Sequence, residues 1–299
     1  MLSKKLVSRT NRLLRKFGVE MRRYSPPANA SFSNWMYYSK VLEREWLKTE
    51  HGAPALDEGF VDFCVRHHEH SRSQIFQDLL VLFLLQEKRG GFFVEFGATD
   101  GVSLSNTWLL EKHYGWSGIV AEPARRWHKA LIKNRGCTID TRCVWSQSGE
   151  TLVFNETEEA ELSTLENFVG SDHKSKDRVV AHPYRVETVS LIDLLVGNDA
   201  PHAIDYISID TEGSEYSILK DFDFDAFEIG IITVEHNFVK SNREKLFQLL
   251  ARNGFRNVLA EHSTFDDWYV NENVLKNRLA GLSAGTPSKS RTDGMPAHP

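Results

Sequence analysis

Short apolar segments alternate with helix-like segments through the middle of this 299-residue chain. The segments that we expect to be strands are residues 92–96, 118–122, 137–145, 204–210 and 229–235, with a shorter one at 151–155. Those that we expect to be helices are residues 74–87, 103–113, 125–134, 214–220 and 242–253. Residues 255–260 and 264–270 predict a final antiparallel pair. This repeated alternation predicts an open, doubly wound α/β sheet whose strands are mostly parallel.

The predicted sheet also indicates where a ligand would bind. In open α/β sheets, ligands bind beyond the carboxyl ends of the strands, at the point where the strand order reverses. The segments that should meet there are residues 95–101, 122, 140–147, 210–215 and 235–238. We therefore look for functional residues in these turns.

The turn after the first predicted strand, Glu95-Phe96-Gly97-Ala98-Thr99-Asp100-Gly101, carries two glycines and two acids. Gly97 would let a ligand approach the backbone, and Gly101 would form the turn into the next helix. Dinucleotide-binding turns have the spacing G-x-G-x-x-G, but Thr99 stands at the second glycine position. Because Glu95 and Asp100 disfavour a phosphate, the turn favours a cationic ligand. S-adenosylmethionine, with its sulfonium, α-ammonium and ribose diol, fits this chemistry.

Glu122 ends the second predicted strand, where an acid can accept hydrogen bonds from both hydroxyls of a ribose. Nicotinamide-dependent enzymes place an acid at the same position, so Glu122 alone does not separate the two cofactors. A helix-start acid before Pro123 is the structural alternative.

Three motifs together resemble the FkbM family of methyltransferases: residues 91–101, 118–123 and 204–215. The upstream Ser73-Gln74-x-x-Gln77-Asp78 and the downstream Ser105-Asn106-Thr107 resemble a subgroup of that family. The resemblance covers residues 73–270 in the order of the family. It implies a class I methyltransferase fold, which is Rossmann-like, with S-adenosylmethionine as the methyl donor. It usually implies O-methylation of a sugar or polyketide hydroxyl, without fixing the acceptor.

The donor-binding residues that we expect come from the first two turns and from the two flanking motifs. Gln74 and Asp78 share a helix face, where they either reach the amino-acid end of the donor or cap the helix. The full expected set is Gln74, Asp78, Glu95, Gly97, Asp100, Gly101, Ser105, Asn106 and Glu122. No residue is assigned to the adenine ring.

The turns after the fourth and fifth predicted strands carry the candidates for catalysis. A hydroxyl acceptor needs a base that takes its proton, and Asp210 is the first candidate for base or acceptor orienter. His236 is a second candidate base, with Glu235 orienting it or binding acceptor hydroxyls. A turn-capping Asp210 and a structural His236 are the alternatives.

The same turns offer ligands for a divalent metal that would lower the pKa of an acceptor hydroxyl. The candidates are Asp210, Glu212, Glu235 and His236, with Glu215 as a substitute. No recognised metal-binding spacing accompanies them, so the sequence predicts an enzyme that needs no metal.

The N-terminus differs in charge from the rest of the chain. Residues 1–24 carry eight basic residues and one acid, so the other residues sum to −12 out of a total of −5. Leucines among these cations predict a basic amphipathic helix that lies on an anionic membrane surface. The alternative is a helix docked on its own domain or on a second subunit. Residues 25–72 predict an aromatic-rich helical extension, residues 73–275 the methyltransferase domain, and residues 276–299 a disordered tail.

Composition excludes several classes of protein. The longest apolar run, residues 79–85, is far shorter than the roughly 20 residues that span a bilayer. Three cysteines without a C-x-x-C spacing indicate neither a disulfide framework nor a zinc site, and they favour a reducing compartment. We therefore expect a cytoplasmic protein, peripheral at the inner membrane surface if residues 1–24 bind it. An acidic body argues against a nucleic-acid partner.

The leading hypothesis is an S-adenosylmethionine-dependent O-methyltransferase acting on a sugar or a surface glycan. Two alternatives stay open: a catalytically inactive methyltransferase fold that serves as a scaffold, and a methyltransferase of a small metabolite. Thr99, at the position of a fingerprint glycine, argues against a nicotinamide-dependent oxidoreductase.

Overall fold

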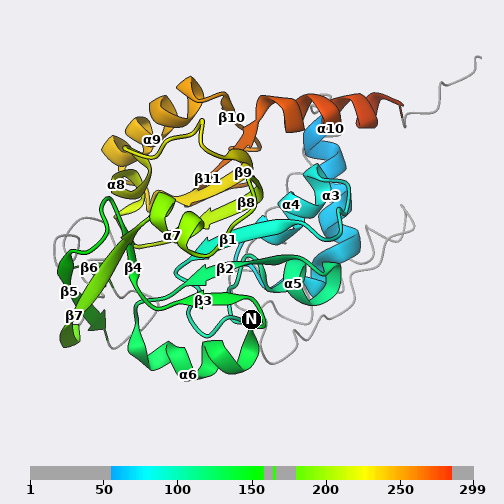
Figure 1. Ribbon diagram of the computed structural model, residues 1–299. Coiled ribbons are helices and arrows are strands. Elements are labelled where there is room, and N and C mark those ends of the chain that lie inside the picture. The colour runs from blue at the N-terminus through cyan, green and yellow to red at the C-terminus, as the bar shows by residue number, and fades with distance from the viewer. Residues whose placement is uncertain (1–54, 158–163, 166–179, 285–299) are drawn as a thin grey trace, which may run out of the picture.

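The computed structural model describes residues 55–157, 164–165 and 180–284 (Figure 1). The predictions for residues 1–24 and for residues 25–54 therefore lie outside the described residues. None of the described helices is long and apolar enough to cross a membrane.

A seven-stranded sheet forms the centre of the molecule, in the order β10-β11-β9-β8-β1-β2-β3. Its strands are β1 (Phe92–Phe96), β2 (Ser117–Ala121), β3 (Thr138–Asp140), β8 (Ala203–Ile209), β9 (Glu228–Glu235), β10 (Phe255–Asn257) and β11 (Asp266–Asn271). Strands β3, β2, β1, β8 and β9 are parallel, whereas β11 is antiparallel to both β9 and β10. The strand order reverses between β1 and β8, which confirms the predicted doubly wound sheet with an antiparallel C-terminal strand.

Helices cover both faces of this sheet (Figure 1). They are α3 (Ala55–His67), α4 (Gln77–Leu84), α5 (Trp108–Tyr114), α6 (Arg125–Asn134), α7 (Leu191–Gly197), α8 (Glu215–Leu219), α9 (Lys240–Arg252) and α10 (Glu272–Ala284), with a 3₁₀ turn at His68–His70. Because successive strand side chains point to opposite faces, Phe93 enters one apolar core and Val94 and Phe96 enter the other. The first core packs under α3, α4, α5 and α6, and the second under α7, α8 and α9.

A second, four-stranded sheet was not predicted. It has the order β4-β7-β5-β6 and consists of β4 (Cys143–Trp145), β5 (Thr151–Thr157), β6 (Thr164–Leu165) and β7 (Val180–Ser190). The single strand predicted over residues 137–145 is wrong, because it is divided between β3 and β4, which belong to different sheets. Asp140 Oδ1 accepts from the backbone N–H of Arg142 at 2.8 Å, and the Arg142 guanidinium pairs with Asp140 Oδ2 at 2.6 Å. This pair turns the chain between the two strands.

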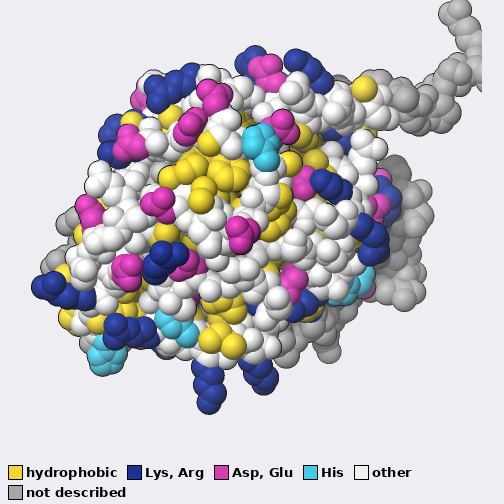
Figure 2. Space-filling model, in the orientation of Figure 1, with side chains coloured by type: hydrophobic (Ala, Val, Ile, Leu, Met, Phe, Trp, Pro, Cys, Tyr) yellow, Lys and Arg dark blue, Asp and Glu magenta, His cyan; other side chains and the backbone are white. Residues whose placement is uncertain are grey.

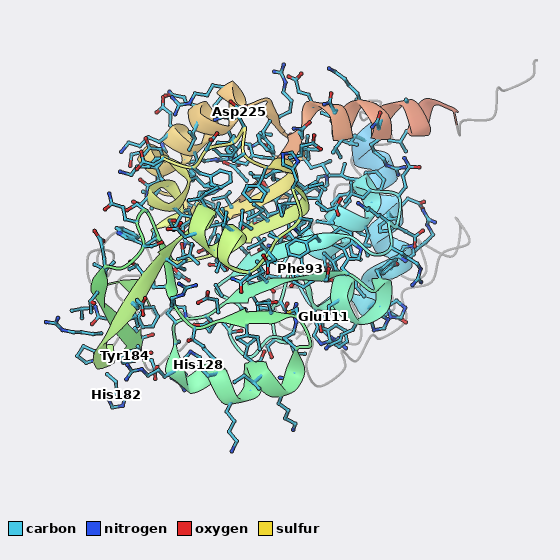
Figure 3. All side chains as sticks on the ribbon, in the orientation of Figure 1. Phe93, Glu111, His128, His182, Tyr184 and Asp225 are labelled. Atoms are coloured by element: carbon cyan, nitrogen blue, oxygen red, sulfur yellow. The ribbon has the colours of Figure 1, made fainter. Side chains whose placement is uncertain are left out.

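The antiparallel pair of β5 and β7 contacts the start of α6. Tyr184, which Figure 3 labels on β7, accepts a hydrogen bond from the Arg125 backbone N–H at 3.0 Å and donates to Glu156 at 2.9 Å. In Figure 2, Lys and Arg side chains protrude along the lower edge of the molecule, where α6 runs. The predicted helix over residues 125–134 and the predicted strand over 92–96 are confirmed residue for residue.

Two predicted helices are too long at their starts. The helix expected over 103–113 begins only at Trp108, because buried polar contacts hold the preceding residues in a loop. The helix expected over 74–87 begins at Gln77 and ends at Leu84, and Phe76 before it has a positive φ of 69°.

The predicted disordered tail is wrong for residues 276–284, which belong to α10.

Helix α3 shares the core of the domain, although its residues were predicted to form part of a separate extension. Phe60 is fully buried, and its ring centroid lies 5.7 Å from that of Phe83 and 5.6 Å from that of Trp268. The described part of the extension is thus integral to one face of the sheet.

Candidate active site

A cavity lies at the carboxyl ends of β1, β2, β8 and β9, where the strand order reverses. Five carboxylates line it, and among the described residues no Lys, Arg or His does. The acids are Glu95, Glu122, Asp210, Glu212 and Glu235. A cavity of this charge attracts a cation or a ligand with many hydrogen-bond donors.

Glu95, at the end of β1, is neutralised inside the cavity wall. Its Oε2 lies 3.2 Å from Nη1 of Arg135, whose side chain is fully buried. The Asn106 backbone N–H donates to Glu95 Oε1 at 2.6 Å, and Thr107 Oγ1 donates to Glu95 Oε2 at 2.6 Å. Ser105 also donates to Glu95, and it does not line the cavity. Glu95 and Ser105 therefore hold the loop before α5, a role that the sequence did not reveal.

Two further acids that were predicted to bind the donor instead accept hydrogen bonds from their own chain segments. Asp100 Oδ1 accepts from the backbone N–H groups of Val102 and Ser103 at 2.8 and 2.7 Å. Asp78, which is fully buried, accepts from Ser71 and Ser73 hydroxyls at 2.7 Å each, while burial raises its pKa. Neither side chain lines the cavity, so the structure does not place them with the other predicted donor-binding residues, and their role in donor binding stays a prediction. Gln74, from the same motif as Asp78, does line it.

Both glycines of the first turn are required for packing. Gly97 has a φ of +77°, and a Cβ atom there would lie 2.1 Å from the carbonyl oxygen of Asp210, which follows the neighbouring strand. Gly101 has a φ of +79°, and its Cβ would lie 2.6 Å from Cγ of Arg135. Gly97 borders the cavity, whereas Gly101 does not, and a role of either in donor binding stays a prediction.

Glu122 lies where the sequence predicted, at the end of β2 on the cavity wall. Its Oε2 accepts from the Thr99 backbone N–H at 2.8 Å, and its Oε1 accepts from the Ala124 N–H at 2.7 Å. Burial raises the pKa of Glu122 to about 7 in spite of these donors, and the charge of Asp210 adds to the rise. Further hydrogen-bond donors, such as the hydroxyls of a ribose, would therefore stabilise the ionised form of Glu122.

The wall beside Glu122 contains residues that the sequence analysis missed. Cys143 and Val144 from β4 and Phe154 from β5 line the cavity, and all three side chains are buried. They form an apolar surface that suits a flat aromatic ring. Their apolar character was visible in the sequence, but their position was not, because β4 was interpreted as a continuation of β3.

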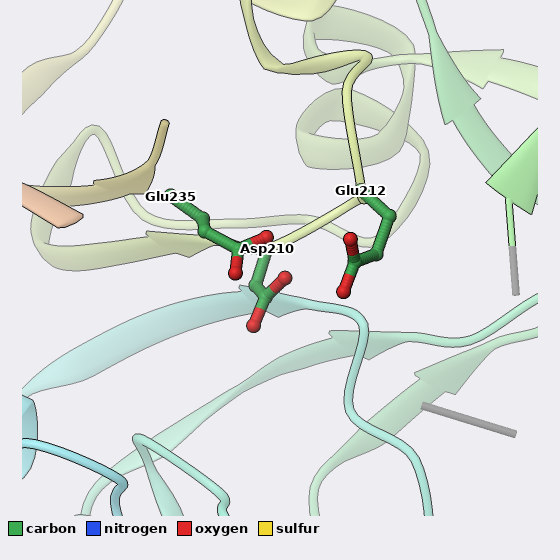
Figure 4. Close-up of side chains that lie close together, drawn as sticks. All are labelled: Asp210, Glu212 and Glu235. Atoms are coloured by element: carbon green, nitrogen blue, oxygen red, sulfur yellow. The ribbon is translucent and has the colours of Figure 1, made fainter. Parts of the chain in front are cut away.

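Three carboxylates meet on the opposite wall, as Figure 4 shows. Oxygen atoms of Asp210, Glu212 and Glu235 all lie within 4.8 Å of one another. Asn237 Nδ2 donates to Glu212 Oε2 at 3.1 Å and to Glu235 Oε2 at 2.6 Å. The structure thus brings together three of the four predicted metal candidates; the fourth, His236, is not among them.

His236, one of the predicted bases, lies outside the cavity lining. Its Nδ1 accepts from the Phe238 backbone N–H at 3.0 Å, and its Nε2 lies 4.0 Å from Oδ1 of Asp267. Burial lowers the pKa of His236, although Asp267 opposes that shift. The structure therefore does not bring His236 to the cavity together with Asp210 and Glu235, and its role as general base stays a prediction.

Some of the backbone strain lies in the same turns. Four of the eleven described non-glycine residues with positive φ follow β1, β8 and β9, namely Thr99, Glu212, Asn237 and Phe238, with φ angles between 45° and 59°. Such conformations are costly for residues with side chains.

Asn106 supplies a neutral acceptor at the cavity. Its side chain is 8% exposed, and its Nδ2 donates to Ser208 Oγ at 2.9 Å. Among the described residues, none donates to its Oδ1. Because a buried acceptor without a donor is unfavourable, Asn106 suits a ligand that carries an N–H donor such as an ammonium group.

A family model for the methyltransferase FkbM domain matches residues 95–257, more than half of the chain. No curated protein matches the sequence.

Solved structures with similar folds are methyltransferases. The precorrin-6y C5,15-methyltransferase of Geobacter metallireducens is 10% identical, with a TM-score of 0.35 over 64% of this chain and 85% of that one. An O-methyltransferase of Bacillus cereus, solved in complex with SAH, is 13% identical, with a TM-score of 0.34 over 88% of this chain and 95% of that one. The human methyltransferase 10 domain containing protein is 11% identical, with a TM-score of 0.34 over 90% and 97%. At such scores these likenesses add no weight to the strand order and the family match.

Proposed function

The chain belongs to the FkbM family of methyltransferases, and on that premise we propose that it methylates a hydroxyl group of a sugar or glycan with S-adenosylmethionine as donor. Methyl transfer itself follows from the family. The hydroxyl acceptor and its sugar character are proposals supported by the chemistry of the cavity.

The chemistry of the cavity walls suits the donor. Five carboxylates line it without a Lys, Arg or His among the described lining residues, and although Glu95 pairs with Arg135, the other acids suit a ligand with a sulfonium and an ammonium group. Glu122 would bind the ribose hydroxyls, and the apolar wall formed by Cys143, Val144 and Phe154 would contact the adenine. Asn106, together with Gln74, would bind the amino-acid end, because its Oδ1 needs a donor. When bound, S-adenosylmethionine supplies a methyl group that is already activated for transfer.

The wall formed by Asp210, Glu212 and Glu235 is the proposed acceptor site. Carboxylates accept hydrogen bonds, so a cluster of them suits a molecule with several adjacent hydroxyls, such as a sugar. Glu212 and Glu235 are 5% and 3% exposed and share the Asn237 amide, whereas Asp210 is more exposed. We assign acceptor orientation to Glu212 and Glu235. Asp210 takes the hydroxyl proton.

This division of roles needs little from the protein beyond alignment. Because the methyl group arrives activated, the enzyme has to hold the hydroxyl in line and exclude water. The hydroxyl proton would pass to Asp210 as the new carbon–oxygen bond forms and the carbon–sulfur bond of the donor breaks, which leaves S-adenosylhomocysteine. The expectation of an enzyme that needs no metal stays a prediction, which a calorimetric titration with Mg²⁺ and Mn²⁺ tests.

The observation that carries the proposal is a cavity lined by five acids, and by no Lys, Arg or His among the described residues, at the reversal of strand order in a chain of this family. Isothermal calorimetry with S-adenosylmethionine and S-adenosylhomocysteine tests the donor site in the wild type and in Glu122→Ala. We expect micromolar binding that Glu122→Ala weakens at least about tenfold. Unchanged affinity in Glu122→Ala would contradict the donor site.

The acceptor is tested by mass spectrometry of surface polysaccharide from cells with and without the gene. A sugar that loses one methyl group in the deleted strain is the expected result. Complementation with Asp210→Asn should fail to restore it, whereas Asp225→Asn, an exposed aspartate outside the cavity, should restore it. As purified protein, Asp210→Asn should keep its donor affinity and lower kcat by roughly 10²–10⁴-fold.

A further inference from the structure

We propose that the outward face of α6, extended by the start of β7, docks on an anionic lipid bilayer. The α6 face is defined here by five residues: Arg125, Arg126, Lys129, Ile132 and Lys133, all of them exposed. The proposal does not depend on the identity of the methyl acceptor.

The charge of the α6 face is concentrated and free of acids. The helix has the sequence RRWHKALIKN, without a single Asp or Glu, in a chain whose residues outside 1–24 sum to −12. Within the part of the chain that the structure describes, Arg125, Lys129 and Lys133 form no ion pair. Cations that are not neutralised within the protein are available to an external anionic surface.

An exposed isoleucine stands among these cations. Ile132 is 63% exposed, three residues after Lys129 and next to Lys133, while its neighbour Leu131 is fully buried and anchors the helix. A single exposed apolar side chain is common on protein surfaces. Flanked by lysines on one helix face, however, it has the composition of a helix that lies in the headgroup region. The lysine stems would extend beside it while their ammonium groups stay in water.

The start of β7 continues the same surface. The Arg125 guanidinium lies 4.3 Å from the ring centroid of Tyr184 and donates to the carbonyl of Arg185 at 3.3 Å. His182 is exposed two residues before Tyr184 and so lies on the same face of the strand, whereas the exposed Arg185 and Glu187 lie on the opposite face. Figure 3 labels His182 and Tyr184 at this end of β7. Figure 2 shows Lys, Arg and His side chains around hydrophobic ones on this lower edge.

A bilayer fits this surface better than a nucleic acid does. Proteins that bind single strands offer exposed aromatic rings on which bases stack. Here Trp127 and Tyr184 are only partly exposed, and the guanidinium groups of Arg126 and Arg125 lie over their rings. The exposed apolar residue is aliphatic, which favours insertion among lipid chains.

Docking through the α6 face would also orient the active site. Helix α6 begins two residues after Pro123, which lines the cavity. The cavity would therefore lie close to the lipid headgroups.

Vesicle flotation of the full-length protein tests the proposal. The probes are phosphatidylcholine vesicles with and without phosphatidylserine, at low and high salt. The α6 variant is Lys129→Glu, Ile132→Asp and Lys133→Glu together. A matched control on α9 is Lys240→Glu, Phe247→Asp and Lys245→Glu, because these residues are exposed and Phe247 is 50% exposed. Melting temperature and donor affinity, measured for each variant, report whether it is folded.

We expect the wild type to float with the anionic vesicles alone, and high salt to weaken that binding. The α6 variant should lower the vesicle partition coefficient by about tenfold or more, and the α9 control by less than about twofold. Equal binding of the wild type and the α6 variant would overturn the proposal, as would an equal loss in the α9 control. So would α6-dependent binding of a single-stranded oligonucleotide without any binding of vesicles.

The predicted contact of residues 1–24 with a membrane is separable from this one. Lys4, Lys5, Arg9 and Arg12 are changed to Gln in both the wild type and the α6 variant, again as full-length chains. If the α6 face binds by itself, the α6 substitutions lower partition by the same factor in both backgrounds. An effect of the α6 substitutions that vanishes when these four residues are Gln would overturn an independent α6 site.

Discussion

At the scale of single residues, Glu122 combines burial with a position where a ligand can satisfy it. Its pKa of about 7 means that much of the protein without donor carries this carboxyl protonated at neutral pH. Ribose hydroxyls would donate to the ionised form and so lower that pKa on binding. The donor therefore binds with release of a proton, and its affinity must depend on pH.

Donor affinity should rise with pH between 6 and 8. With a pKa of about 7 in the free protein and a lower one in the complex, the gain reaches about tenfold across this interval. Calorimetry with S-adenosylmethionine and S-adenosylhomocysteine at several pH values measures it. Glu122→Gln, which does not titrate, should flatten the dependence for both ligands. A wild-type affinity that does not change with pH would contradict the role of Glu122.

Glu215, at the start of α8, gives a stability prediction that is independent of the ligand. Its Oε1 accepts from the backbone N–H of Gly213 at 2.8 Å, yet burial raises its pKa to about 7. Between the unfolded pKa near 4.5 and the folded value, the folded state binds more protons, so stability falls as pH rises.

Urea unfolding at pH 5 and pH 8 checks this sign. The carboxyl of Glu215 should contribute a loss of up to about 3 kcal/mol in the free energy of unfolding over that interval. Glu215→Gln should lose less stability than the wild type does between the two values. The assignment would be refuted if the free energy of unfolding fell less between pH 5 and pH 8 in the wild type than in the Gln variant.

At the scale of elements, the contact between the first turn and β8 fixes the floor of the cavity. Gly97→Ala would place a methyl group 2.1 Å from the carbonyl oxygen of Asp210, which is backbone and cannot move aside. Gly90 has a similar φ of +66°, but nothing lies within 4 Å of its missing Cβ. Comparing alanine substitutions at the two glycines thus distinguishes the effect of a positive φ from the effect of steric overlap.

Gly97→Ala should therefore lower the free energy of unfolding by about 1–3 kcal/mol more than Gly90→Ala does. It should also weaken donor binding, because the overlap pushes the turn away from β8. Chemical denaturation and calorimetry on the two variants measure both effects. Equal destabilisation by the two substitutions would show that positive φ, and not packing, is the reason for Gly97.

The limits of sequence interpretation are clearest in the elements that frame the site. Glu235 faces the cavity and His236 does not, because successive residues at the end of a strand point to opposite sides. Asp210 and Glu235 could be predicted, since each ends an apolar strand. The pairing of Glu95 with Arg135 could not, because their side chains are 40 positions apart and only the fold brings them together.

At the scale of the whole molecule, the central sheet was predictable because its signal is local. Strands β1, β2, β8 and β9 are each a short apolar run followed by a helix, so the pattern alone fixes the class of fold. The second sheet was not predictable, because β7 finds its register against β5, which lies across an intervening segment that includes residues outside the description. The apolar wall of the cavity depends on that second sheet and was missed with it.

Helix α3 belongs to the same folding unit as the sheet. Phe60→Ala removes a fully buried ring that touches Phe83 and Trp268, and it should lower the free energy of unfolding by about 3–5 kcal/mol. Val65→Ala on the same helix, where the side chain is 50% exposed, should change it by less than about 0.5 kcal/mol. Denaturant unfolding followed by both fluorescence and circular dichroism measures this. A Phe60→Ala variant as stable as Val65→Ala would show that α3 is an independent appendage.

The carboxamide of Asn237 connects two chain segments at the ends of different strands. One amide nitrogen holds Glu212, which follows β8, and Glu235, which ends β9. A molecule that draws one of these carboxylates toward itself therefore pulls on the other through the shared nitrogen. Glu212 and Glu235 should therefore move together, and a substitution in either segment should change the position of both carboxylates in the proposed acceptor site.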